Sequence, residues 1–384
     1  MHRSLTVAGL LGITAVLTLA AHARDGRDVD GAAIAGTAAA DAGTLVTAPA
    51  MSAARAAHTA TTLLDGRVLV AGGFVAPGAP HSAELFDAAR DRFVPLPPMI
   101  VSRHSHTATR LADGRVLIAG GFGPNNATLA AAELFDPATN SFRATGAMRE
   151  ARNGHVAVLL GDGKVLLIGG LGPNWTFLSS AELYDPATER FTPTGPLSVA
   201  RESHVAVRLL DGRVLVVGGH RGRRDDMVIH ASTEIYDPAT GRFSMSGAMQ
   251  TRRHKHDAVL LADGKVLVSA GSDERDDRGM YTSTELFDPA TGSFTAGPSL
   301  AIARHKLAGS SVLLPGGQVL VSGGAAQAER YDPATRRFST VGGDARMAGF
   351  FSAAAGLRDG RVLITGGYGN GGGPRASAWM YRPR

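Results

Sequence analysis

A motif that ends in a pair of small residues recurs seven times along the 384-residue chain, and it constrains the fold more than any other feature. The pair is Gly-Gly in six units and Ala-Gly in the fifth. Its second residue falls at Gly73, Gly121, Gly170, Gly219, Gly271, Gly324 and Gly367, so the spacings are 48, 49, 49, 52, 53 and 43 residues. A period of about 50 residues is typical of an array of units the size of a propeller blade.

Each unit predicts four short strands. In the third unit, residues 155–160 alternate, Asp162-Gly163 has the composition of a two-residue hairpin turn, and residues 165–168 are continuously apolar. Such an apolar run is expected where a strand is buried on both faces. A third strand is expected at 181–184, followed by an Asp-Pro-Ala-Thr turn and a short strand from Phe191. The pattern predicts an all-β chain of stacked four-stranded sheets.

These residues resemble the kelch repeat. The shared features are Arg-x-x-His, then Gly-Gly, then Glu-[Leu/Ile]-[Tyr/Phe]-Asp-Pro, then an aromatic residue, and they cover about residues 44–384. The fourth strand carries Phe in place of the usual Trp, at Phe93, Phe142, Phe191, Phe243, Phe294 and Phe338. The resemblance implies a seven-bladed β-propeller, in which blades surround a central channel.

The two ends of the repeat region predict how the ring closes. The last unit stops after its third strand, at 378–383, and has no fourth strand. Counting back from Met51 and Arg55 places Leu45-Val46-Thr47 in a fourth-strand position with no third strand before it. We therefore expect this N-terminal segment to pair with the strand that holds Met380 and Tyr381, which would protect both sheet edges.

The N-terminus has the pattern of an export signal. His2 and Arg3 precede an apolar segment, 5–20, and Ala21-His22-Ala23 fits a signal peptidase site. We expect residues 1–23 to be a signal peptide cleaved after Ala23, residues 24–43 to be a disordered linker, and residues 44–384 to be the propeller, secreted or periplasmic. No other apolar run is long enough to span a membrane, and we expect a monomer.

The composition limits which partners the protein is expected to bind and how its fold can be stabilised. The chain has no Cys, so its core must hold the fold without disulfides. Its formal net charge of +5 comes from Arg residues spread over the repeats and not from a basic run, which gives nucleic-acid binding little support.

The loops predict where a ligand would bind. Strand direction alternates within a blade, so the Asp-Gly and Asp-Pro turns all lie on one face, which we call the turn face. The loops between the second and third strands and the connections between blades lie on the opposite face, which we call the loop face. The turn face repeats and the loop face varies, which favours binding on the loop face. The candidate ligand-binding residues are Trp175, Phe177, Arg221, Arg223, Arg224, Asp225, Asp273, Glu274, Arg275 and Tyr368. The competing interpretation is a set of solvated loops with Trp175 packed on a neighbouring blade.

Histidines recur three residues after an Arg in five units, at His58, His106, His155, His204 and His256. Imidazoles near an axis can bind a metal, but one per blade spreads them around a ring. We therefore expect structural bonds between blades, with the repeated Glu pairing with the Arg series, and no metal or cofactor. The sixth unit lacks the aligned His, and we place Arg346 at the Arg position of the seventh.

The resemblance implies several functions. Galactose oxidase, a secreted kelch enzyme, uses a copper site with a Tyr cross-linked to Cys, and a chain without Cys cannot form that cofactor. Sialic-acid epimerases also use kelch propellers, and Arg221, Arg223, Arg224 and Glu274 could bind an acidic sugar. We predict a secreted, non-catalytic propeller that binds a glycan or protein partner through its loop face. The alternative is a carbohydrate-active enzyme, epimerase- or oxidase-like, with a site at the channel mouth.

Overall fold

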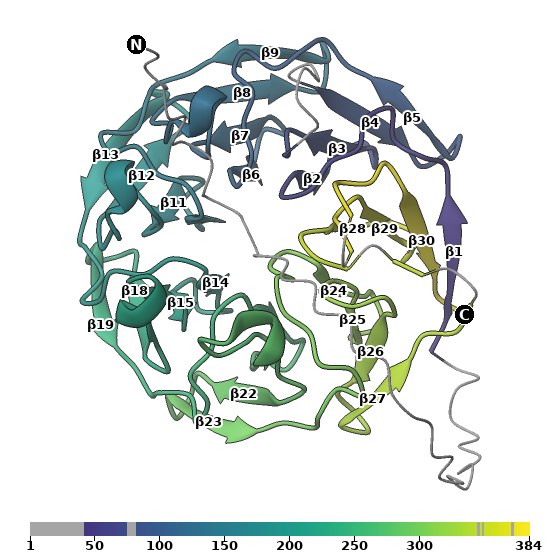
Figure 1. Ribbon diagram of the computed structural model, residues 1–384. Helices are drawn as coiled ribbons and strands as arrows, with labels where there is room; N and C mark the ends of the chain where they lie inside the picture. The colour runs from purple at the N-terminus through teal and green to yellow at the C-terminus, as the bar shows by residue number, and fades with distance from the viewer. Residues whose placement is uncertain (1–41, 75–81, 344–345, 348, 370–371) are drawn as a thin grey trace, which may run out of the picture. The chain divides into compact units, whose positions relative to one another are not determined.

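The computed structural model describes residues 42–74, 82–343, 346–347, 349–369 and 372–384. The predicted signal peptide and all but the last two residues of the predicted linker lie outside the described residues. The described part of the chain forms seven four-stranded antiparallel sheets, and Figure 1 shows them arranged as blades around a central axis (the channel axis). Within this part, no helix is long and apolar enough to cross a membrane.

The blades follow one another along the chain, and each begins with its innermost strand. Blade 1 contains β2 (Thr59–Thr62), β3 (Val68–Ala71), β4 (Ala83–Asp87) and β5 (Arg92–Pro95). Blade 2 contains β6 (Thr107–Arg110), β7 (Val116–Ala119), β8 (Ala132–Asp136) and β9 (Ser141–Ala144). Blade 3 contains β10 (Val156–Leu159), β11 (Val165–Ile168), β12 (Ala181–Asp185) and β13 (Arg190–Thr194). Blade 4 contains β14 (Val205–Arg208), β15 (Val214–Val217), β18 (Thr233–Asp237) and β19 (Arg242–Met245).

The remaining blades have the same order. Blade 5 contains β20 (Asp257–Leu260), β21 (Val266–Ser269), β22 (Thr284–Asp288) and β23 (Ser293–Ala296). Blade 6 contains β24 (Ser311–Leu313), β25 (Val319–Val321), β26 (Glu329–Asp332) and β27 (Arg337–Thr340). Blade 7 contains β28 (Ala353–Gly356), β29 (Val362–Thr365), β30 (Ala378–Arg382) and β1 (Thr44–Ala48). The loop face adds a small hairpin of β16 (His220–Arg221) and β17 (Val228–Ile229), and the short 3-10 turns η2 (Pro124–Asn126), η3 (Pro173–Trp175), η4 (Arg224–Asp226) and η5 (Asp276–Arg278).

The ring closes through the N-terminal strand, as predicted. β1 pairs antiparallel with β30, with Leu45 opposite Tyr381 and Val46 opposite Met380. Figure 1 shows β1 as the outermost strand beside β28–β30. The innermost strands also contact their neighbours around the channel, and β28 contacts β2 to complete the circle. The free edge of β30 is therefore covered by a strand from the other end of the propeller, which removes an unpaired edge.

The core lies between the blades. The second strands are buried on both faces, which explains their unbroken apolar sequence. Each apolar cluster joins two neighbours; one combines Leu69 and Leu85 of blade 1 with Val116 and Phe135 of blade 2. The fourth-strand Phe packs on the aromatic residue of the third strand, with ring centroids 4.8 Å apart for Tyr184 and Phe191. Stability is therefore shared around the whole ring.

The predicted Arg–Glu pairs are present, but each lies within one blade and not between blades as expected, and the bonds to the preceding blade are made by the backbone and by histidines. The Arg201 guanidinium pairs with Glu234 of its own blade at 2.9 Å, while its backbone N–H donates to Leu178 O of the preceding blade at 3.2 Å. Six such Arg–Glu pairs are present, at Arg55–Glu84, Arg103–Glu133, Arg152–Glu182, Arg201–Glu234, Arg253–Glu285 and Arg304–Glu329. Three of the repeated His, His58, His106 and His155, also bond to the preceding blade; His58 Nε2 lies 2.8 Å from Thr365 Oγ1 of blade 7.

The alignment of the seventh unit was wrong. Gly324 N donates to Gly349 O at 2.8 Å, the same bond that Gly121 N makes to Arg152 O. Gly349, and not Arg346, therefore occupies the Arg position. Gly349 lies 11 residues after Phe338, close to the 10 residues between Phe142 and Arg152, whereas Arg346 lies only 8 residues after Phe338, so matching Arg to Arg shifted the register. The Glu position is occupied by Trp379, which is buried in the same apolar cluster as Met347, and apolar contact replaces the ion pair there.

Candidate functional site at one mouth of the channel

A belt of seven residues surrounds the channel at the loop face. Its members follow the repeated Arg position by two residues, are half-buried, and have left-handed φ values of 52° to 56°. They are Ala57, Ser105, Gly154, Ser203, Lys255, Lys306 and Phe351. At six of the seven blade junctions the backbone N–H of one belt residue donates to the C=O of the belt residue before it, at 2.9–3.1 Å. The first and last blades join in this way, because Ala57 N donates to Phe351 O.

The residue that directly precedes each belt residue in the chain differs from blade to blade. In six blades the residue after the Arg position pairs through the backbone with the residue after the glycine pair. These pairs are Ala56–Phe74, His104–Phe122, Asn153–Leu171, Glu202–His220, His254–Ser272 and Phe350–Tyr368. The glycines allow this approach, since a Cβ at Gly121 would lie 2.5 Å from His104 O. The backbone positions repeat but the side chains do not, which is the pattern of a specific site on a common frame.

An aromatic arc occupies blades 1 to 3. We define it as Phe74, His104, Phe122 and Trp175, whose successive ring centroids are 5.8, 5.2 and 6.2 Å apart. Phe74 is 48% and Trp175 39% exposed, which is high for such large rings. The Arg223 guanidinium from blade 4 lies over the Trp175 ring, 3.6 Å from its centroid. The arc therefore combines exposed ring surface with a cation that is in place for a cation–π contact.

A histidine pair lies next to the arc in blades 4 and 5. His220 Nδ1 and His254 Nδ1 are 3.1 Å apart, and His254 Nε2 lies 3.3 Å from Asp273 O. The carbonyl can only accept, so His254 Nε2 carries the proton and His254 Nδ1 accepts from His220 Nδ1. Burial lowers the pKa of both histidines. The two histidines thus form a neutral hydrogen-bond chain that runs from His220 through His254 to Asp273 O in the loop of blade 5.

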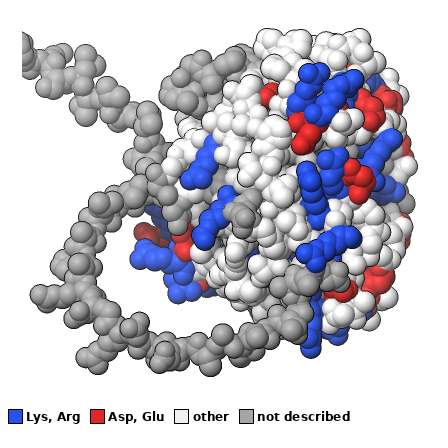
Figure 2. Space-filling view, turned by 90° about the vertical axis from the view of Figure 1, so that its right-hand side faces the viewer, with Lys and Arg blue, Asp and Glu red and all other residues white. Residues whose placement is uncertain are grey.

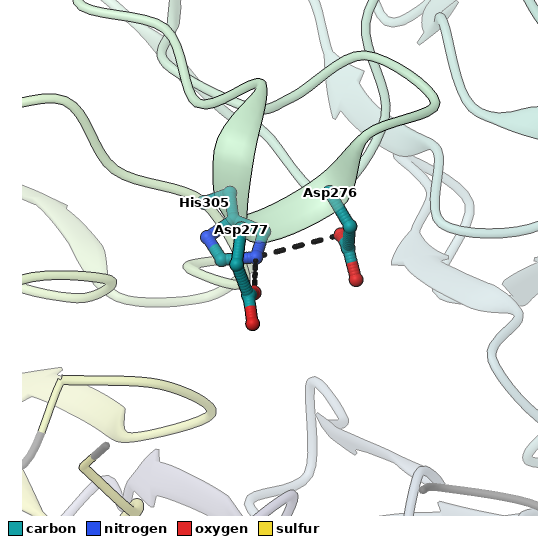
Figure 3. Close-up of side chains that lie close together, drawn as sticks. All are labelled: Asp276, Asp277 and His305. Atoms are coloured by element: carbon teal, nitrogen blue, oxygen red, sulfur yellow. Dashed lines mark ion pairs between the residues drawn. The ribbon is translucent and has the colours of Figure 1, made fainter. Parts of the chain in front are cut away.

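A charged cluster follows in blades 5 and 6, which we define as Lys255, Asp276, Asp277, His305 and Lys306. Figure 3 shows Asp276, Asp277 and His305 converging on one point from two different segments. Lys255 Nζ donates to Asp276 Oδ1 at 2.8 Å, and Lys306 Nζ donates to Asp277 Oδ1 at 3.0 Å. His305 Nε2 lies 2.8 Å from Asp277 Oδ1 and 3.4 Å from Asp276 Oδ1. Phe350 borders the cluster, with its ring 5.0 Å from Lys306 Nζ.

The ionisation of the cluster follows from burial and from its neighbours. Burial alone would raise the pKa of Asp276, but the Lys255 and Lys306 ammoniums bring it down to about 2. Burial, together with Lys306, lowers the pKa of His305 to about 4, so the imidazole is neutral at pH 7. Burial would lower the pKa of Lys306, yet Asp276, Tyr368 and Asp277 raise it. The cluster therefore sets a neutral imidazole beside the charged side chains of Asp276 and Lys306.

The structure brings some of the sequence-predicted residues together and separates others. Trp175 is stacked under Arg223, and Phe177 meets His220 edge-on with centroids 5.6 Å apart. Asp273 is buried and holds its own loop through Arg275, whose Nη2 lies 2.5 Å away. The rest are placed as follows: Arg221, Arg224 and Asp225 are exposed, Glu274 pairs with Arg252, and Tyr368 packs on Phe350 and Phe351.

Sequence reasoning missed most of the mouth. It did not select His220, Lys255, Asp276, Asp277, His305, Lys306 or Phe350. Several of these stand in the variable loops or in the sixth unit, which lacks the aligned His. Lys255 and Lys306 lie inside the repeated motif, and the motif was interpreted as structural. A useful signal was present, because the two residues after the repeated Arg are the variable positions of an otherwise constant segment.

Other surfaces offer less chemistry. A cavity of about 570 Å³ lies on the turn face and is lined mainly by apolar residues such as Leu313, Pro315 and Leu357, with Arg361 as its charged residue. Arg361 already donates to Asp359 and to Ala88 O. Figure 2 shows basic and acidic side chains interspersed on one side of the molecule. The loop-face mouth therefore remains the candidate site.

The family model for the kelch motif matches residues 152–198 and 203–250, which are the third and fourth units. No curated protein matches the chain. Among solved structures, a fungal alcohol oxidase of the AA5 family in complex with copper is similar, with a TM-score of 0.69 and 17% identity over 90% of this chain and 76% of the oxidase. At that identity the likeness shows the shared fold alone.

Proposed function

The chain is a kelch-repeat β-propeller, and on that premise we propose that it is an exported, non-catalytic protein that binds a glycan at the loop-face mouth of its channel. The observation that carries the proposal is the aromatic arc. Its two most exposed rings belong to Phe74 and Trp175. Exposed aromatic rings beside polar groups are what sugar recognition requires, since the rings cover the C–H faces and the polar groups bond the hydroxyls.

Polar groups of the right kind surround the arc. Asn125 and Asn174 stand in matching turns of blades 2 and 3, with left-handed φ values of 55° and 54°. Both side chains are exposed, so their amides are accessible to hydroxyl groups. Arg223 adds donors above Trp175. A neutral glycan fits this surface better than a polyanion, because acidic residues such as Asp225 lie close to the arginines in the chain and are exposed with them.

The two tryptophans of the chain provide a direct test. Trp175 is exposed in the arc, whereas Trp379 is buried in blade 7. A glycan array would identify hits, and titration of each hit should change the fluorescence of the wild type and of Trp379→Phe but not of Trp175→Phe. Phe74→Ala should weaken binding by roughly tenfold, the loss of one stacking contact of about 1.4 kcal/mol. If no glycan on the array bound and a protein ligand instead bound the surface that carries Phe74 and Trp175, the glycan proposal would be rejected.

Export is a separate part of the proposal. It rests on the N-terminal pattern, and a mature N-terminus at Arg24, read from protein recovered outside the cytoplasm, is the expected result. Recovery of the intact N-terminus from the cytoplasm would contradict it.

A second candidate, an enzyme that acts on a carbohydrate at the same mouth, is favoured by the charged cluster. Neutral His305 and the half-buried ammonium of Lys306 are groups that can move protons. Turnover of an array hit, abolished by Lys306→Met and retained in Trp379→Phe, would establish this candidate in place of simple binding.

A further inference from the structure

We infer that Asp276, Asp277 and His305 form a binding site for a first-row divalent transition metal ion. The three side chains place one ligand atom each within 4.8 Å of one another. Carboxylate oxygen combined with imidazole nitrogen is a donor set that suits Zn²⁺ or Mn²⁺ better than Ca²⁺, which prefers oxygen alone. Metal binding here does not require the proposed glycan binding.

The second observation is the state of His305. Its side chain is completely buried, yet neither ring nitrogen forms a hydrogen bond of acceptable geometry within the described residues. Its Nε2 is aimed at the carboxylates, 2.8 Å from Asp277 Oδ1. The ring is held by an edge-on contact with Phe350, at a centroid distance of 4.9 Å. A buried imidazole normally has a partner, and a cation between its lone pair and the two carboxylates would supply one.

The acidic residues alone would not support a site, as a neighbouring turn shows. Asp225-Asp226 in η4 and Asp276-Asp277 in η5 are both acidic pairs in short 3-10 turns of adjacent blades. Only the second pair faces a buried histidine in the described structure. The first pair is therefore a matched control that has the same charge and turn type but lacks the third ligand.

The lysines determine how tightly the site can bind. Lys255 and Lys306 neutralise the two carboxylates, at 2.8 and 3.0 Å. A cation that takes the same oxygens must displace both ammoniums, because like charges repel at this range. Affinity should therefore be moderate in the wild type and should increase when a lysine is removed. This response distinguishes a metal site from an ion-pair network, in which removal of a lysine brings no gain in metal binding.

The test is a titration of the purified full-length protein with Zn²⁺ by isothermal calorimetry, with Mn²⁺ and Ca²⁺ as separate arms. We expect one Zn²⁺ per chain, weaker binding of Mn²⁺ and no binding of Ca²⁺. Asp277→Asn should weaken Zn²⁺ binding by at least about tenfold because it replaces a charged ligand oxygen by a neutral one, and His305→Gln should abolish it because it removes the imidazole nitrogen. Asp225→Asn/Asp226→Asn should bind as the wild type does, and Lys306→Met should bind about tenfold more tightly.

The variants leave a clear route to rejection. The Asp277 side chain is half exposed, so its replacement spares the core even where His305→Gln fails to fold. Equal Zn²⁺ affinity in the wild type and Asp277→Asn, or no gain in Lys306→Met, would overturn the assignment.

Discussion

Lowering the pH should unfold this propeller well before its carboxylates are protonated. All ten histidines in the described residues are buried. The five repeated ones, His58, His106, His155, His204 and His256, lie in the interior beside their Arg neighbours. Burial lowers the pKa of His58 and His204 to about 3, and places the other three well below the ordinary value.

The sign follows from linkage. An imidazole with a depressed folded pKa stays neutral in the native state but is protonated in the unfolded chain below about pH 6.5, so stability present above that pH is lost as the pH falls. Each such group favours unfolding by about 2 kcal/mol at pH 5. The five repeated histidines together contribute about 10 kcal/mol, which is comparable to the whole stability of a typical domain.

The assay is urea unfolding, followed by fluorescence at pH values from about 7 to 5. The slope of the unfolding free energy against pH gives the number of protons taken up on unfolding. His155→Gln should take up one proton fewer on unfolding, whatever it costs in stability. An unfolding free energy that changes by less than about 3 kcal/mol over this interval would refute the reasoning, because a single titrating histidine would then account for it.

Three further outcomes follow from the fold. Deletion of residues 44–50 removes β1 and exposes the edge of β30, so the melting temperature should fall sharply, and an unchanged melting curve would contradict ring closure. Arg201→Met should cost about 3–5 kcal/mol in urea unfolding because it strands the buried carboxylate of Glu234, whereas Arg201→Met/Glu234→Leu should recover most of that loss, and equal losses would argue against the pairing. Burial raises the pKa of Asp257 to about 6, so its contribution to stability is present at acidic pH and is lost as the pH rises through 6; between pH 5 and pH 7 Asp257→Asn should lack this loss of about 1 kcal/mol, seen as a difference from the wild type over that interval.

The fold could be predicted from the sequence because repetition multiplies weak local signals. One apolar run between a turn and a glycine pair is ambiguous, but seven in register specify blades, and the count back from Met51 was enough to pair the segment that holds Leu45 with the strand that holds Tyr381. The same reliance on the repeat failed in blade 7. There Arg346 lies three residues before the Arg position, which Gly349 occupies, and only the backbone bond from Gly324 reveals it.

The site was only partly accessible from the sequence. Trp175 and Arg223 were selected as residues of variable loops, but their stacking joins blades 3 and 4 and depends on loop conformation. The charged cluster was missed for a different reason. Its carboxylates come from η5, whereas Lys306 and His305 come from the next repeat, and no spacing in the chain indicates that these segments converge.

The belt has one further consequence. Its blade-to-blade bonds run through main-chain atoms, so the ring does not depend on which side chains stand there. The natural set already ranges from the hydrogen of Gly154 to the ring of Phe351. Single substitutions in the belt can therefore change the width and the charge of the mouth one blade at a time. The main-chain bonds that join the blades stay the same.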